Sequence, residues 1–394
     1  MKRVVGLVAV MSAAALGVVA CGGGGSSSST TSAAPTTSAA PTTSAAPTTS
    51  AAPNPIDEAK AYLDSRLANP TSIGLTQPLS KKPEAGKLIV RLLTPVPIQD
   101  DISLGTEMGA KALGWDYKAI PISADADGIQ KAFQAALEMK PAGIAYGGYP
   151  ASILTEQLQA AADAGVKIVP DSAVDAPGSA PGIEVMLDGI PEQLAWGKDL
   201  AAFVAGDSGG GAHVAIFTVS AFPILEPVVT GLTENLATWC PDCKTTVVDQ
   251  TLADIGTKTP QSVVSTLQKD PSINYILFTF GDLATGVTAA LDTAGLSAQA
   301  KVIGSAVSNA GLQNLRDGKD AAWVGLPPQL LGWRSIDVFA RMFNGDSLDE
   351  EKTALLPSQI ITQANVNGIV LDDKGFYNAV AGFEAQFKAL WLVP

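Results

Sequence analysis

Residues 275–291, YILFTFGDLATGVTAAL, decide the fold of this chain. The run 275–280 is too short for a helix and rich in aromatic and branched side chains, which predicts a buried parallel strand. Gly281 and Asp282 form a turn, and the apolar residues of 283–291 recur at helical spacing. We therefore expect Asp282 where a strand ends and a helix begins. There its carboxylate can cap free N–H groups or reach into a crevice.

The same alternation of strand and helix continues on both sides of this stretch, from residue 87 onward. The patterns predict strands at 88–93, 117–122, 143–146, 166–170, 183–187, 213–219, 245–248, 275–280, 301–303 and 322–324. They predict helices at 100–113, 128–139, 151–164, 192–205, 225–238, 260–269, 283–294 and 312–317. Strands joined by crossovers of this length are parallel and are covered by helices on both faces. The sequence therefore predicts an α/β protein with two Rossmann-like lobes, each built on a parallel sheet, and a cleft between them.

Composition narrows the function further. The 394 residues are enough for about two domains, and 46% of them are hydrophobic, so a large core is available. The formal net charge of −13 disfavours nucleic acid and anionic membrane surfaces as partners. A single histidine, His213, removes the usual component of catalytic triads and zinc sites. We expect no catalytic residue, no metal site and no cofactor.

The first 21 residues have the pattern of a secretory signal peptide. Lys2 and Arg3 give a positive start, 4–20 is apolar with many small residues, and Cys21 follows. A transmembrane anchor is the alternative, but such an anchor needs ~20 apolar residues and this run is at the short end. Residues 22–55 are a low-complexity linker, in which TTSAAP recurs four times. Its threonines either carry sugars or form a bare spacer.

The end of this signal resembles a lipobox, whose cysteine becomes the lipidated first residue of the mature lipoprotein. The resemblance implies that Cys21 carries a lipid and tethers the protein to the outer face of the cell membrane, with no other membrane contact. Residues 56–86 follow the linker as a short helix and a proline-punctuated strap, which we expect to lie against the folded body.

The folded body resembles the type I periplasmic binding proteins, specifically the ribose/galactose-binding-like family, over about residues 87–394. The opening stretch resembles the signature ND-x-x-A-x-G-x-x-x-A-L, with Asp282 in register and Gly281 in place of its Asn. The run AGVKIVPD at 164–171 resembles the end of the fourth strand of the family's first lobe, where an aspartate lies at the cleft.

The resemblance also implies how the chain is divided between lobes, because this family's chain crosses between them three times. The crossings are expected near 175–180, 326–328 and 356–358. The expected N-terminal lobe comprises 87–176 plus 327–356, and the expected C-terminal lobe comprises 177–326 plus 357–394.

Few of the polar ligand-binding residues of the family's sugar-binding members are kept. Asp171 and Asp282 match family positions at the cleft. Asp282 can equally serve as a helix N-cap, whereas for Asp171 ligand contact is favoured over capping. Ser172 and Val228 stand where those members have arginines, and Gly281 stands for the asparagine.

Aromatic residues at or just past strand ends can line a flatter and more apolar cleft, although Trp323 can equally be ordinary core. The turn after the first strand, Thr94-Pro95-Val96-Pro97, stands where sugar-binding members have an Asn-Pro-Phe-Phe-like turn with its aromatic rings. The resemblance therefore implies a ligand less polar than a free monosaccharide, or a sugar held by rewired contacts. The candidate ligand-binding residues are Pro95, Tyr146, Asp171, Ser172, Phe222, Asp282 and Trp323.

Three motifs look catalytic, but their context favours other roles. GDSGG at 206–210 and GDSL at 345–348 copy hydrolase motifs, yet their serines need a histidine that only His213 can supply. The WCPDC run at 239–243 resembles a thioredoxin site, but it follows a helix instead of starting one, so its thiols lack the helix N-terminus that lowers a thiol pKa. In an exported protein we expect Cys240 and Cys243 to form a structural disulfide.

These features imply a monomeric solute-binding protein that delivers a small molecule to the permease subunits of an ABC-type importer. The alternative is a sensory module that presents its ligand to a membrane receptor or kinase. An extracellular hydrolase is disfavoured by the missing triad. A repressor of the same fold is excluded by the export signal and the lack of a basic DNA-binding segment.

Overall fold

Two β-sheets form the framework of the computed structural model, which describes residues 54–123 and 125–394. The first sheet has the order β2-β1-β3-β4 and is parallel throughout. Its strands span Leu88–Leu93 (β1), Asp116–Pro121 (β2), Gly143–Gly147 (β3) and Lys167–Asp171 (β4). The second sheet has the order β10-β9-β8-β7-β5-β6. Its strands span His213–Thr218 (β5), Lys244–Asp249 (β6), Tyr275–Phe278 (β7), Lys301–Gly304 (β8), Asp320–Val324 (β9) and Ile360–Thr362 (β10).

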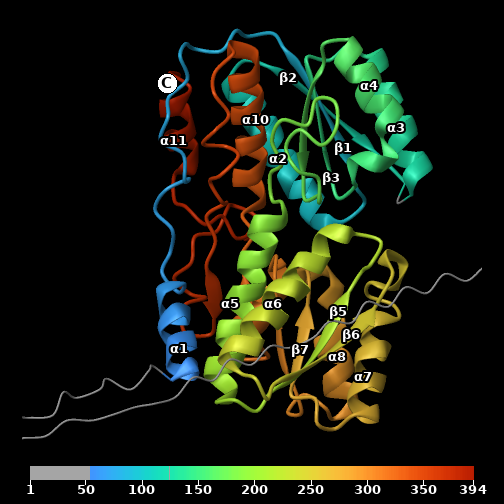
Figure 1. Cartoon of the computed structure of the whole chain (residues 1–394), viewed down its shortest axis with the longest axis vertical. Helices are drawn as coiled ribbons and strands as arrows, with labels where there is room; N and C mark the ends of the chain where they lie inside the picture. The colour runs from blue at the N-terminus through green and yellow to red at the C-terminus, as the bar shows by residue number, and fades with distance from the viewer. Residues whose placement is uncertain (1–53, 124) are drawn as a thin grey trace, which may run out of the picture. The chain divides into compact units, whose positions relative to one another are not determined.

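Helices flank both sheets, and each sheet with its helices forms a lobe (Figure 1). In the first lobe α2 packs against α10, and α3 packs against α4; these helices span Pro97–Ala112 (α2), Ala126–Glu138 (α3), Thr155–Asp163 (α4) and Pro328–Asn344 (α10). In the second lobe α5 packs against α6, and α7 packs against α8. Its helices span Ile190–Ser208 (α5), Glu226–Trp239 (α6), Thr259–Lys269 (α7), Val287–Ala294 (α8) and Asn309–Arg316 (α9).

Side-chain alternation along β1 decides which residues reach which layer of helices. Val90 and Leu92 join the core that includes Phe133 of α3. Ile89 belongs to the other core, with α2 and α10. Arg91 points to the same face as Ile89, and this places a fully buried charge beside α2.

The two parallel-sheet lobes confirm the predicted α/β fold class. One strand departs from the expected pattern, because the short β10 pairs antiparallel with β9. The predicted helix 283–294 is also interrupted. Residues Gly281–Ala284 form a 3-10 turn, and α8 begins only after Gly286, whose φ of 79° lies in the left-handed region.

Two segments lie against a different lobe from the one expected. Ile183 and Leu187 form parallel bridges to β4, so the strand predicted to open the C-terminal lobe extends the first sheet, and the chain crosses after it. The C-terminal helix α11 (Phe383–Leu390) packs on α10 of the first lobe, and Trp391 stacks on Trp333 with ring centroids 5.1 Å apart. Apolar periodicity predicts that a helix has a buried face, but it does not specify the partner.

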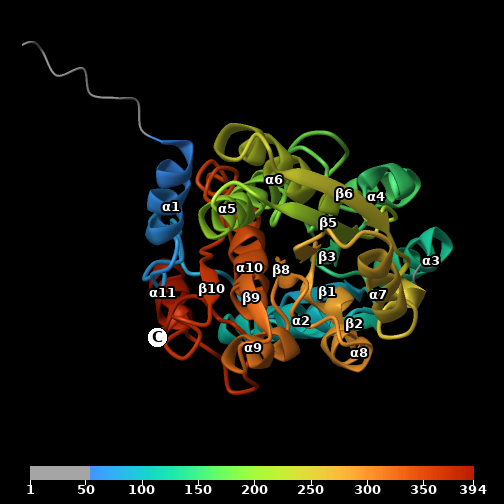
Figure 2. The ribbon, with the colours of Figure 1, turned by 90° about the horizontal axis from the view of Figure 1, so that it is seen from below.

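Residues 54–86, which we call the N-terminal brace, contact both lobes. Its helix α1 (Pro55–Ser65) packs on α5 and α6 of the second lobe, and Figure 2 shows it next to α5. At its end Arg66 Nε lies 3.0 Å from Asp199 Oδ1. The following strap contacts the first lobe and α11, where the Leu79 N–H donates to the Leu390 carbonyl (2.9 Å).

The predictions for the signal peptide, for Cys21 and for most of the linker lie outside the described residues. Within residues 54–123 and 125–394, no helix combines the length and the apolar character that a membrane span requires.

Candidate ligand-binding cavity between the lobes

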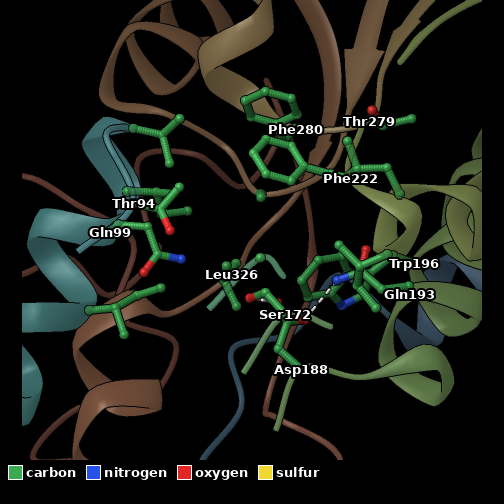
Figure 3. Close-up of a pocket in the computed structure, with 17 residues that line it drawn as sticks. Thr94, Gln99, Ser172, Asp188, Gln193, Trp196, Phe222, Thr279, Phe280 and Leu326 are labelled. Carbon is green, nitrogen blue, oxygen red and sulfur yellow. Dashed lines mark hydrogen bonds between the residues drawn. The ribbon is translucent and has the colours of Figure 1, made fainter. Parts of the chain in front are cut away.

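A cavity with about 620 Å³ of empty space, part of it open to solvent, lies between residues of the two lobes (Figure 3). Small-molecule sites in proteins are usually lined mainly by apolar side chains, with a few placed polar groups. Its walls are mostly apolar, and they include three aromatic side chains, Trp196, Phe222 and Phe280. The polar residues among its lining are Thr94, Gln99, Ser172, Asp188, Gln193 and Thr279.

The first lobe contributes the segment that follows β1 and the first turns of α2. Thr94, Val96, Ile98 and Gln99 all line the cavity, because β1 ends at its edge and α2 begins there. Thr94 donates its hydroxyl hydrogen to the carbonyl of Gly147 (3.0 Å), which ties this segment to the end of β3. The carboxyl ends of neighbouring parallel strands thus form one wall, the usual position of ligand sites in such sheets.

The second lobe contributes most of the aromatic lining. Phe222 precedes the short 3-10 helix Pro223–Leu225, and Phe280 follows β7. Phe222 also packs edge-to-face on Tyr149 of the first lobe, with ring centroids 6.0 Å apart. Figure 3 shows Phe222 and Phe280 close together on one side of the cavity. Their rings give this wall a flat, apolar surface.

A polar corner lies where the chain first crosses between the lobes. Asp188 is 2% exposed and accepts two hydrogen bonds, from Ser172 Oγ (2.6 Å) and from Gln193 Nε2 (2.7 Å), as the dashed lines in Figure 3 mark. Burial, with further contributions from Glu192 and Asp171, raises the pKa of Asp188 well above its ordinary value, against the effect of both hydrogen bonds. Ser172 and Asp188 have φ values of 51° and 49°, in the left-handed region that non-glycine residues rarely adopt.

A buried ion pair supports the first-lobe wall from behind. Arg91 and Asp171 are both 0% exposed, and Nη1 of Arg91 lies 2.8 Å from Oδ2 of Asp171. Nη2 of Arg91 donates to Oε1 of Gln99 (2.7 Å), which fixes the side chain of a cavity-lining residue. The packing is close, because a Cβ atom on Gly147 would lie only 2.3 Å from Oδ1 of Asp171.

Asp282 reaches from the second lobe to the first turn of α2. Val96, the N-cap residue of α2, provides no side-chain hydrogen bond to the helix. The backbone N–H of Ile98, in the first turn of α2, is close enough to Asp282 to act on its carboxylate. Burial raises the pKa of Asp282, and the backbone N–H of Ile98 opposes the rise.

The structure brings only part of the predicted ligand-binding set to the cavity. Ser172 and Phe222 line it, and Pro95 lies between two lining residues, Thr94 and Val96. Asp171 lies behind the wall in its ion pair, and Asp282 contacts α2.

Tyr146 and Trp323 lie in the cores of their lobes. Tyr146 alternates to the face covered by α3, where it packs on Phe133 with ring centroids 6.2 Å apart. Trp323 is fully buried and donates its indole N–H to Oδ2 of Asp320 (2.8 Å). A position at the end of a strand was therefore not enough to identify a cavity residue. Successive side chains point to opposite faces of the sheet, and the position does not say which face is meant.

Sequence reasoning missed Arg91, Gln99, Asp188 and Gln193. Arg91 carries a usable signal, since a charge inside the run LIVRLL of a buried strand needs a partner. Gln193 has no such signal, because a polar residue in the first turn of a helix is ordinary.

The residues of the catalytic-looking motifs have structural partners. His213 forms hydrogen bonds to Ser272 and Thr246, each 2.9 Å long, and Ser208 Oγ accepts from the N–H of Gly210. Cys240 and Cys243 lie side by side with their Cα atoms 5.3 Å apart, a spacing compatible with a disulfide. In the part of the chain that the structure describes, no group of three or more His, Cys, Asp or Glu side chains is arranged to hold a metal ion.

Solved structures of other proteins share this fold. Among solved structures, the chain is similar to a 5-methylthioribose transporter solute-binding protein from Thermotoga lettingae in complex with 5-methylthioribose. The identity is 19%, the alignment covers 80% of this chain and 99% of that one, and the TM-score is 0.66. The search of curated proteins gives no match.

Two further structures have the same fold. An ABC transporter solute-binding protein from Agrobacterium vitis with bound allitol is 22% identical, over 72% of this chain and 97% of that chain, with a TM-score of 0.62. A carbohydrate transporter from Acidothermus cellulolyticus in complex with myo-inositol is 18% identical, over 72% and 96%, with a TM-score of 0.60.

The family model described as "Periplasmic binding protein domain" matches residues 101–347, well over half of the chain. This match begins inside α2 and ends just after α10. It contains every strand except β1 and β10, and most of the residues that line the cavity. The chain therefore belongs to the periplasmic binding protein domain family.

Proposed function

We propose that this chain is a lipid-anchored, extracytoplasmic solute-binding protein that captures a small molecule between its two lobes and delivers it to an ABC-type importer. The observation that carries the proposal is the cavity between the lobes, whose walls come from β1 and α2 on one side and from Phe222 and Phe280 on the other. A ligand in this position would contact both lobes at once, so its binding energy would favour the closed form.

The nature of the lining supports a ligand that is less polar than a free monosaccharide. Most lining side chains are aliphatic or aromatic, and buried apolar area contributes ~25 cal/mol per Å². Arg91, whose side chain reaches the cavity-lining Gln99, is already bound by Asp171 and Gln99. The solved structures of the same fold hold a methylthio sugar and polyols, and the first of these fits such a lining better than a free hexose does.

The proposed anchor is a lipid on Cys21, with the following linker as a tether and the cell membrane's outer face as the location. The proposed partners are the small-molecule ligand and the transmembrane subunits of a permease, and we propose a monomer. The support for export and anchoring is the N-terminal sequence pattern alone.

Native mass spectrometry of the protein purified from its own host tests the capture step, because a closed solute-binding protein retains ligand. We expect one small molecule per chain, and we expect its addition to the stripped protein to raise the melting temperature. Uptake by a deletion strain tests delivery. A deletion strain that takes up the identified solute as fast as the parent strain would contradict delivery and favour a sensory role.

A further inference from the structure

One buried acceptor at the polar corner of the cavity has no hydrogen-bond partner. Gln193 is 3% exposed and lines the cavity, and its Nε2 donates to Oδ1 of Asp188 (2.7 Å). Its Oε1 is buried and unpartnered within the described part of the chain. Buried polar atoms are nearly always hydrogen-bonded, so an exception at the wall of a cavity indicates a bond that a ligand completes.

The orientation of this amide follows from its neighbour. Nε2 of Gln193 donates to Oδ1 of Asp188, and this bond turns the amide oxygen of Gln193 away from the carboxyl group. The other carboxylate oxygen is occupied by the hydroxyl of Ser172 (2.6 Å). Asp188 therefore accepts one hydrogen bond from each lobe, from Ser172 and from Gln193. The second bond fixes the orientation of the Gln193 amide.

The ionisable side chains at this corner are all acidic. Among the described residues that line the cavity, Asp188 alone has an ionisable side chain. The charged groups that act on it, Glu192 and Asp171, are both acidic. Nothing in this lining would stabilise an anion.

We infer that Gln193 and Asp188 select the ligand. The cavity takes a small neutral or cationic molecule that donates an O–H or N–H hydrogen to Gln193 Oε1 and places its apolar part against Phe222 and Phe280, and it excludes anions. The backbone supports this role, because Ser172, Asp188 and the cavity-lining Ala306 are all held at φ near 50°. Strained backbone of this kind persists where surrounding contacts fix it, and it gathers at ligand clamps. The inference rests on the proposed function.

Two substitutions separate selection from folding. Gln193→Met keeps the length of the side chain and removes the acceptor. Asp188→Asn keeps the shape of the carboxylate, but the new amide accepts from Ser172 with its oxygen and turns its NH₂ toward Gln193. Gln193 must then rotate its own oxygen toward that NH₂, and the ligand loses its acceptor.

The test measures binding by calorimetry on the full chain with a defined panel. The panel contains 5-methylthioribose, D-arabinose, myo-inositol and allitol, with 2-phenylethanol, phenethylamine and phenylacetate as a neutral, cationic and anionic set on one apolar body. We expect Gln193→Met and Asp188→Asn each to weaken the tightest binder about five- to tenfold, the effect of one lost hydrogen bond. Asp188→Asn should leave the melting temperature unchanged or higher. The control is Gln363→Met, at an exposed glutamine next to β10, and it should bind as the parent does.

Each result decides between the two proposals. Unchanged affinity in both variants, or phenylacetate binding as tightly as 2-phenylethanol and phenethylamine, overturns the inference and leaves the proposed function standing. A preference for phenethylamine over 2-phenylethanol identifies the donor as an ammonium, and the reverse identifies it as a hydroxyl. If no panel member binds and no small molecule co-purifies, the proposed function fails, and the inference fails with it.

Discussion

Arg91 and Asp171 form a buried ion pair, with Nη1 and Oδ2 2.8 Å apart and both side chains inaccessible to solvent. The aspartate is thus part of the wall behind the cavity. It holds Arg91, and Arg91 in turn holds Gln99 at the cavity surface.

Asp171→Ala should therefore destabilise the fold by about 3–5 kcal/mol, because it leaves Arg91 buried without a counter-charge. Urea unfolding measures the change. The double substitution Arg91→Leu with Asp171→Leu removes both charges and should cost less than Asp171→Ala alone. A single variant as stable as the parent would mean that water or another group compensates Arg91.

Asp320→Asn should make the free energy of unfolding depend less on pH between about pH 4 and pH 6. Burial raises the pKa of Asp320 from 3.8 to about 6. A raised folded-state pKa stabilises the fold below the unfolded pKa, so stability is lost as pH rises from about 4 to about 6, by up to ~3 kcal/mol.

In this variant the amide still accepts the N–H of Trp323, and no carboxyl remains to titrate. Urea unfolding at several pH values checks the difference, with Glu156→Gln, at an exposed position on α4, as the matched control. A parent protein whose stability is the same at pH 4 and pH 7 would contradict the assignment.

Phe222→Ala should weaken ligand binding at least tenfold, since it removes much of the apolar wall and the edge-to-face contact with Tyr149. Even a partly buried phenylalanine contributes about 1.5 kcal/mol or more through its buried area. Calorimetry with the tightest binder of the panel gives the comparison. Leu392→Ala, at an exposed apolar residue outside the cavity lining, should bind normally.

Asp282→Ala should weaken ligand binding while leaving each lobe folded. The substitution removes the carboxylate that acts on the N–H of Ile98 in the first turn of α2, and a favourable charge at a helix N-terminus contributes about 0.3–1 kcal/mol. Asp282→Asn is the control, because its side-chain oxygen can still accept from the N–H of Ile98. Solution scattering with saturating ligand should show a larger radius of gyration for Asp282→Ala than for Asp282→Asn. Equal radii would mean that the carboxylate of Asp282 does not help to hold the lobes together.

Joint substitution of Cys240 and Cys243 by Ser should have a small effect, on the order of 2 kcal/mol at most, because a disulfide here closes a loop of only four residues. Urea unfolding of the exported protein, compared with the double variant, measures it. Thiol titration of the unreduced parent should find neither thiol free, and two free thiols would show that the bond does not form.

The fold was accessible to sequence reasoning because its signals are local. The run at 275–280 and the alternation around it depend on residues that are neighbours in the chain. Which lobe a segment packs on depends on residues that are distant in the chain. Phe383 and Phe387 mark a buried helix face, but only the folded chain shows that this face packs on Trp333 of the first lobe.

The site was less accessible, because its residues acquire their roles from distant partners. Asp171 is at a strand end, as a ligand-binding residue would be, yet Arg91, eighty residues earlier, determines what it does. The orientation of the Gln193 amide is set by its hydrogen bond to Asp188. Asp188 lies where the chain crosses between the lobes, and no local sequence pattern indicates that crossing.

The N-terminal brace has a mechanical consequence. The chain before residue 54 joins α1, and α1 is fastened to the second lobe through Arg66 and Asp199. A pull on the N-terminus would therefore act on the second lobe before it acts on the first. The strap is held by the first lobe from about Thr71 onward. The five residue steps from Arg66 to Thr71 span at most roughly 18 Å, since an extended chain advances at most ~3.6 Å per residue, so this is an upper limit on the separation of the two attachment points.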